Sequence, residues 1–172
     1  LEQAKSLLKG GPEDREVYLP LAQMHSRLKR WDDAAQHITK ALELASKPDE
    51  KEYVNFTLAA MYERQKKYDQ AEDTFKKVLA NDPNNAVALN YLGYMLADRG
   101  MRLDEALGYI KKAVQLDPQN GAYLDSLGWA YFKMGKYELA EENLRKAVEK
   151  VNGDPTVLDH LGDLFKRTDR LK

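Results

Sequence analysis

The chain has 172 residues, of which 43% are hydrophobic and 32% charged, and its formal net charge is −1 at pH 7. This composition is typical of a soluble, helix-rich protein, and the balanced charge does not favour nucleic acid or an anionic membrane surface as a partner. The sequence has no cysteine, no apolar run near the ~20 residues that span a bilayer, and charged residues at Glu2, Lys5 and Lys9 that interrupt any signal-peptide pattern.

Helical spacing of apolar residues predicts a series of helix pairs. In chain order, the predicted elements are a lone second helix over 1–11, helix pairs over 15–48, 52–85, 86–120 and 121–154, and a first helix without its partner over 155–172. The clearest pair has Leu124, Leu127 and Tyr131 on one helical face and Ala140 and Leu144 on the next. Ten helices in one array are therefore expected.

Small residues recur at a nearly constant interval along these pairs. One series has gaps of 37, 35 and 34 residues and consists of Ala34, Ala71, Ala106 and Ala140. A second runs beside it and consists of Ala22, Ala59, Gly93, Gly128 and Gly162. Self-similarity at this period is typical of a stacked array. Because only small side chains let two helices approach closely, these positions are expected to mark where paired helices nest.

The fourth pair carries a family pattern in Leu124, Leu127-Gly128, Tyr131, Gly135, Tyr137, Ala140 and Ala147. This pattern resembles the tetratricopeptide repeat. The second pair departs from it at Lys66, where glycine is usual, and the third has one extra residue near 100–102. The resemblance implies an all-α fold, an α-α superhelix with a right-handed twist. It also implies that first helices line a concave face that binds proteins or peptides.

Residues 90–100 and 124–129 resemble a subgroup found in bacterial proteins, some of which are envelope lipoproteins. The compartment stays open between the cytoplasm and, if the full-length protein carries a signal or lipidation sequence, the periplasm.

The resemblance also implies which side chains meet a partner, because the family's inward positions recur along each first helix. Spacings of four residues keep these positions on one stripe. We call the resulting set the inward stripe: Arg27, Phe56, Arg64, Asn90, Tyr94, Asp98, Asp125, Trp129, Phe132, Lys133, Asp159, Asp163 and Arg167. Tyr94 and Trp129 are the predicted anchors for an extended or helical segment of mixed charge, since Trp and Tyr are frequent binding hot spots. The alternative is that both aromatics pack between neighbouring repeats.

No cofactor, metal site or enzymatic activity is predicted. His25, His37 and His160 lack metal-ligand spacing. Ser126, with His160 and Asp125 at neighbouring repeat positions, lacks the oxyanion site that a nucleophilic serine needs. The family's carboxylate clamp is not expected either, because no repeat pairs a fifth-position lysine with a ninth-position asparagine.

The leading functional hypothesis is a non-catalytic protein-binding scaffold. One alternative is a structural array that self-associates head-to-tail through its unpaired terminal helices. Another is a regulatory module of a larger protein.

Overall fold

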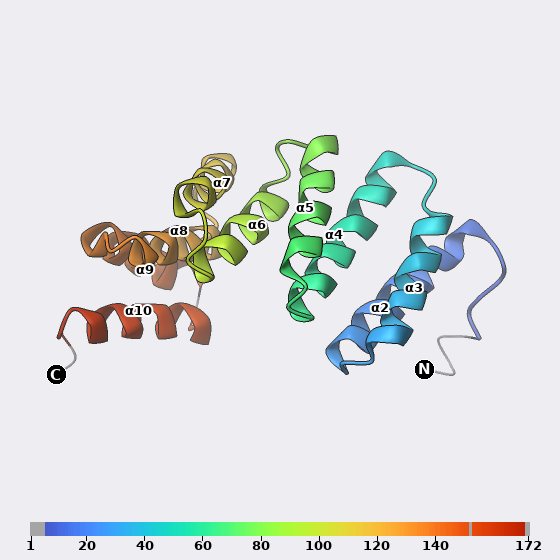
Figure 1. The fold of residues 1–172 in the computed structure, drawn as a ribbon, viewed down its shortest axis with the longest axis horizontal. Helices are drawn as coiled ribbons and strands as arrows, with labels where there is room; N and C mark the ends of the chain where they lie inside the picture. The colour runs from blue at the N-terminus through green and yellow to red at the C-terminus, as the bar shows by residue number, and fades with distance from the viewer. Residues whose placement is uncertain (1–5, 152, 171–172) are drawn as a thin grey trace. The chain divides into compact units, whose positions relative to one another are not determined.

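The computed structural model describes residues 6–151 and 153–170, and in this part of the chain it contains nine α-helices, one short 3-10 helix and no strand (Figure 1). The elements are η1 (Pro12–Asp14), α2 (Arg15–Arg27), α3 (Trp31–Leu44), α4 (Pro48–Arg64), α5 (Tyr68–Asn81), α6 (Ala86–Asp98), α7 (Leu103–Leu116), α8 (Gly121–Lys133), α9 (Tyr137–Lys150) and α10 (Pro155–Arg167). The predicted all-α fold is confirmed. None of the described helices is both long and apolar enough to cross a membrane.

The N-terminal segment differs from the sequence prediction of a lone helix over 1–11. Residues 1–5 lie outside the described residues, and residues 6–11 form turns and bends that lead into η1. The buried carboxylate of Asp14 accepts hydrogen bonds from the backbone N–H groups of Lys9 and Gly10, each at 2.8 Å. Gly10 has a φ of 80°. These bonds and the left-handed glycine favour a turn over a helix here.

The described residues form two compact units that divide between Pro83 and Asn84. The first unit contains α2 to α5. Its core around the first helix pair consists of Leu19, Ala22, Ala34, Ile38, Ala41, Ala45, Val54 and Met61. The second unit contains α6 to α10. Its helix α8 is buried at every residue from Tyr123 to Tyr131, because it packs against α6 and α7 as well as α9 and α10.

The small-residue series marks the contacts inside each pair, as predicted. Ala34, Ala71 and Ala140 have no exposed surface. A methyl group added to Gly93 would lie 2.6 Å from Cγ1 of Ile110 and 2.9 Å from a backbone carbonyl oxygen of the facing helix α7. Distances this short leave no room for a side chain, so the helices nest at these positions.

The turns inside the helix pairs share one hydrogen-bond pattern. In the α8–α9 turn, the N–H groups of Gly135 and Lys136 donate to carbonyl groups in the last turn of α8, each at 2.9 Å. Lys66 and Lys67 make the same bonds to α4, at 2.8 and 2.9 Å. Lys66 therefore adopts the left-handed conformation of Gly135, with a φ of 59° against 73°. The departure from glycine at Lys66 leaves the turn unchanged.

Candidate partner-binding site

The inward stripe is divided between the two units. Arg27 and Arg64 are exposed in the first unit, where Phe56 is half-buried and packs edge-on against Phe75 of α5 at 5.8 Å. The other ten residues lie on three first helices of the second unit: Asn90, Tyr94 and Asp98 on α6, Asp125, Trp129, Phe132 and Lys133 on α8, and Asp159, Asp163 and Arg167 on α10. The second unit therefore carries most of the candidate site.

Trp129 is buried among the side chains that form this site, with 7% of its surface exposed. Its ring stacks between His160, at 4.1 Å between ring centroids, and Phe132, at 4.8 Å. Its indole N–H donates to a carboxylate oxygen of Asp98 at 3.0 Å. The ammonium of Lys133 lies 5.2 Å from the same ring and 3.8 Å from that oxygen of Asp98. Trp129 thus joins α6, α8 and α10.

His160 is the centre of a second connection between the same helices. Its Nδ1 lies 2.9 and 3.0 Å from the two carboxylate oxygens of Asp125, and its Nε2 lies 3.5 Å from the hydroxyl of Tyr94. The neutral tautomer that carries its proton on Nδ1 donates to Asp125 and leaves Nε2 to accept from Tyr94. Both His160 and Asp125 are buried. A satisfied buried network of this kind fixes the orientation of its members.

Sequence reasoning assigned no role to His160 beyond a structural or surface histidine. The informative signal was its separation from Asp125, which is 35 residues, one repeat period. Because both ring nitrogens face Asp125 and Tyr94, neither is directed to Ser126, and the nucleophile–base pair considered from the sequence does not form. No cluster of three potential metal ligands occurs among the residues that the structure describes.

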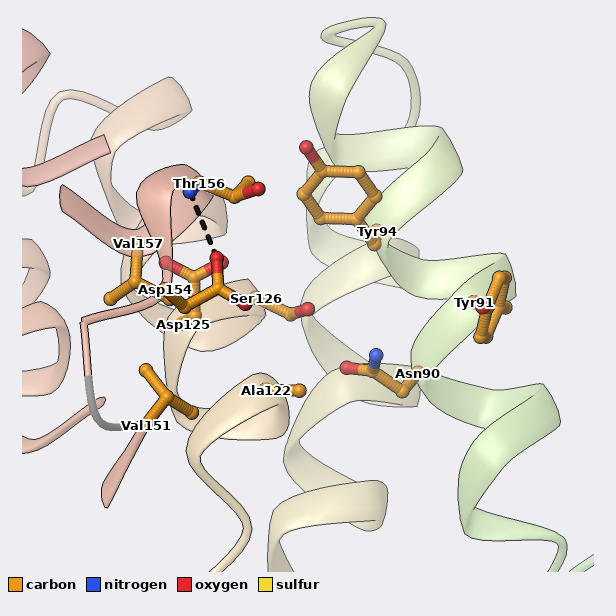
Figure 2. Close-up of a pocket in the computed structure, with 10 residues that line it drawn as sticks. All are labelled: Asn90, Tyr91, Tyr94, Ala122, Asp125, Ser126, Val151, Asp154, Thr156 and Val157. Carbon is orange, nitrogen blue, oxygen red and sulfur yellow. Dashed lines mark hydrogen bonds between the residues drawn. The ribbon is translucent and has the colours of Figure 1, made fainter. Parts of the chain in front are cut away.

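A pocket of about 320 Å³ opens beside this network (Figure 2). It lies between α6, α8 and the start of α10, and its lining consists of Asn90, Tyr91, Tyr94, Ala122, Asp125, Ser126, Val151, Asp154, Thr156 and Val157. The sequence predicted Asn90, Tyr94 and Asp125. It missed Ser126 and Asp154, because these residues lie outside the stripe of inward positions.

Two polar side chains of the pocket, Asn90 and Asp154, differ in their hydrogen bonding. Asn90 is 8% exposed, and its buried Oδ1 has no hydrogen-bond partner. Asp154 is exposed and caps α10, because its Oδ1 accepts the backbone N–H of Thr156 at 2.8 Å. Asp159, Asp163 and Arg167 lie further along α10, outside the pocket lining. The structure therefore brings the α6 and α8 members of the stripe together but leaves those of α10 apart.

Comparison with known protein families gives a direct assignment. Models described as tetratricopeptide repeat match residues 13–84, 56–121 and 122–149. The chain belongs to the tetratricopeptide repeat family. No curated protein sequence matches it.

Several solved tetratricopeptide repeat structures resemble the chain. PilF of Pseudomonas aeruginosa has a TM-score of 0.76 at 27% identity, over 94% of this chain and 72% of that one. A thermophilic repeat protein of Thermus thermophilus has a TM-score of 0.75 at 22% identity, over 91% and 84%. MamA of Desulfovibrio magneticus has a TM-score of 0.71 at 21% identity, over 92% and 87%. These similarities support the repeat fold.

As a tetratricopeptide repeat protein, the chain has the fold of a protein–protein interaction scaffold. Members of this family are generally non-catalytic and bind protein or peptide partners. An array of this type binds through an extended surface that several repeats share.

Proposed function

We propose that the second unit binds a peptide segment of a partner protein along the face formed by α6, α8 and α10. The observation that carries this proposal is the pocket that residues from three successive repeats line, beside a side-chain network that holds them in place. A rigid wall lowers the cost of binding, because fewer side chains lose freedom when the partner arrives.

In this proposal, the two predicted anchors have different roles. Trp129 is buried by His160 and Phe132, so it supports the wall rather than entering a partner's surface. Tyr94 is half-buried and lines the pocket, which leaves part of its ring available for contact. Phe132 and Lys133 are also half-buried. Tyr94 is therefore the proposed contact anchor, with Phe132 and Lys133 beside it.

Selection from a displayed library of random 12-residue peptides tests the proposal. Peptides enriched on the wild-type chain should bind Tyr94→Ala about 30-fold more weakly, the size of a ~2 kcal/mol hot spot. Tyr109→Ala is the matched control: Tyr109 is another half-buried tyrosine, but it lies on the second helix α7, bonded to Glu105.

Circular dichroism checks that each variant is folded. Failure of the wild-type chain to enrich any peptide contradicts the proposal. Equal losses in Tyr94→Ala and Tyr109→Ala also contradict it, because binding would then not depend on the first-helix face.

Head-to-tail self-association depended on a lone helix over residues 1–11. The described part of that segment, residues 6–11, forms turns and bends, so it offers no helix for such a contact. A regulatory role within a larger protein is compatible with the proposed binding face.

A further inference from the structure

We infer that the pocket between α6, α8 and α10 selects a basic side chain, arginine or lysine, from the bound segment. This inference rests on the proposed function, because the basic side chain belongs to the segment that lies along the first-helix face. It adds the chemistry of the residue that enters the pocket.

The charges of the lining favour a cation. Asp125 contributes a carboxylate from α8 and Asp154 one from the N-cap of α10, and no lysine, arginine or histidine is among the described residues that line the pocket. The carboxylate of Asp125 is buried and held in place by Nδ1 of His160 at 2.9 Å. A fixed negative charge next to a buried surface attracts a cation more strongly than a mobile, solvated one does.

Asn90 provides the second, independent indication of a ligand. Its Oδ1 is buried without a partner, which is uncommon for a polar atom in a folded protein. Figure 2 shows this amide extending from α6 toward α8, on the side where Ala122 and Ser126 lie. An N–H donor in the pocket would satisfy this oxygen. An apolar side chain would leave it unpaired, and a carboxylate would place a second acceptor against it.

Two backbone donors that would favour an anion are already occupied. The pocket lies near the N-termini of α8 and α10, where free N–H groups attract negative charge. The N–H of Ala122 donates to Asn120 at 3.1 Å, and the N–H of Thr156 donates to Asp154 at 2.8 Å. The N–H groups of Ala122 and Thr156 are therefore not free to bind an anionic ligand.

The size and remaining walls of the pocket suit one long side chain. A volume of about 320 Å³ is at the small end of the range for ligand pockets. Val151, Val157 and Ala122 can contact the aliphatic part of an arginine or lysine. Figure 2 shows the ring of Tyr94 standing beside the pocket on α6, where a cation can approach its face.

Blocked pentapeptides of the form Ala-Ala-X-Ala-Ala, with X as arginine, lysine, citrulline or glutamate, test this inference by NMR titration of the labelled chain. Citrulline matches arginine in shape but carries no charge. We expect the arginine and lysine peptides to shift the side-chain amide signals of Asn90 and the backbone signals of Ser126 and Thr156. The citrulline and glutamate peptides should bind at least about tenfold more weakly, the loss expected when a charged hydrogen bond is removed.

Two pocket variants and one control variant test whether the arginine peptide binds in this pocket. Asp154→Asn keeps the helix cap but removes the charge, and should weaken the arginine peptide about two- to fivefold without affecting the citrulline peptide. Asn90→Ala should weaken the arginine peptide by about tenfold. Asp104→Asn removes the same charge from an exposed position on α7 and should change neither affinity.

The inference is overturned if the glutamate or citrulline peptide binds as well as the arginine peptide, or if none of the four binds. It is also overturned if Asp104→Asn weakens binding as much as Asp154→Asn. Any of these results leaves the proposed function standing as long as library peptides still depend on Tyr94. Loss of that dependence defeats the proposed function itself.

Discussion

The two units have the same helix-pair architecture but use their histidines differently. In the first unit, His25 is buried between α2 and α3, 5.1 Å from the ring of His37 and 3.4 Å from the carboxylate of Asp33 on α3. In the second unit, His160 contacts Asp125 of α8 and Tyr94 of α6 from α10. One histidine thus supports a single helix pair, whereas the other joins three successive repeats.

The fifth residue position of each repeat, one of the inward positions on the first helix, shows the same difference. In the first unit this position holds Leu19, which is buried in the core, and Phe56, which packs on α5. In the second unit it holds Asn90, Asp125 and Asp159. The second unit therefore has polar residues at positions where the first unit has apolar ones. Polar and ionic groups that are fixed in place provide specificity, so this unit is the better candidate for partner recognition.

The largest expected effect compares how much stability each unit loses when an aromatic side chain is removed from one of its first helices. Trp129→Ala should lower the free energy of unfolding by ~3–5 kcal/mol, because it removes a buried ring that joins three helices. Phe56→Ala should cost about half as much, because Phe56 is only half-buried. Urea denaturation followed by circular dichroism measures both.

Trp129→Phe is the control for the stacking contribution. It keeps an aromatic ring beside His160 and loses the hydrogen bond to Asp98, so it should cost only ~1–2 kcal/mol. Equal losses of unfolding free energy in Trp129→Ala and Phe56→Ala would contradict the expected difference between the two units.

A smaller effect, with opposite signs, is expected for one substitution at equivalent positions of two repeats. Gly93→Ala should destabilise the chain by ~1–3 kcal/mol, because the new methyl group meets Ile110 and the carbonyl oxygen of Ala106. Gly162→Ala should stabilise it by up to ~1 kcal/mol, because a methyl group there has no atom within 4 Å and alanine favours helix. Thermal unfolding of both variants checks the signs. A stabilising Gly93→Ala would refute the assigned nesting of α6 and α7.

The smallest expected effect concerns pH. Hydrogen bonds from the guanidinium groups of Arg170 and Arg145 hold the pKa of Glu141 below its ordinary value of 4.5. A lowered carboxyl pKa contributes stability that is present above pH 4.5 and is lost as the pH falls through the lowered value. Because Arg145 and Arg170 are exposed, solvent screens both ion pairs, and Glu141→Gln should cost no more than ~1 kcal/mol at pH 7.

Melting temperatures at pH 6 and pH 3 measure this contribution. The Glu141→Gln variant should lose less stability between the two values than the wild-type chain. In the first unit, backbone N–H groups of Lys47 and Ser46 lower the pKa of Glu50 instead. Added salt should therefore reduce the Glu141 contribution more than that of Glu50. An identical pH response in Glu141→Gln and the wild-type chain would contradict the assignment.

The positions of the helix pairs were predictable from the sequence, because the spacing of residues such as Leu124, Leu127 and Tyr131 reports local structure directly. The N-terminal segment was not, because its conformation depends on the side chain of Asp14 bonding back to Lys9 and Gly10. Apolar spacing carries no information about such a bond.

Part of the pocket lining was predictable from the sequence, but the contacts around it were not. Asn90 and Tyr94 do line the pocket at their predicted helix. The burial of Trp129 depends on His160, one repeat later, and on the angle at which α10 approaches α8. Contacts between repeats depend on such angles, which residue spacing within one helix does not encode.

The shared turn of the helix pairs affects which substitutions the chain can accept. Since backbone bonds close the turn at Lys66 as they do at Gly135, a mutation there alters the strain of one residue without shifting the helices on either side. The cost of a lysine in the left-handed region is ~1–2 kcal/mol, and it is confined to that residue. The residue at this turn position can therefore differ between neighbouring repeats while the turn keeps the same backbone geometry.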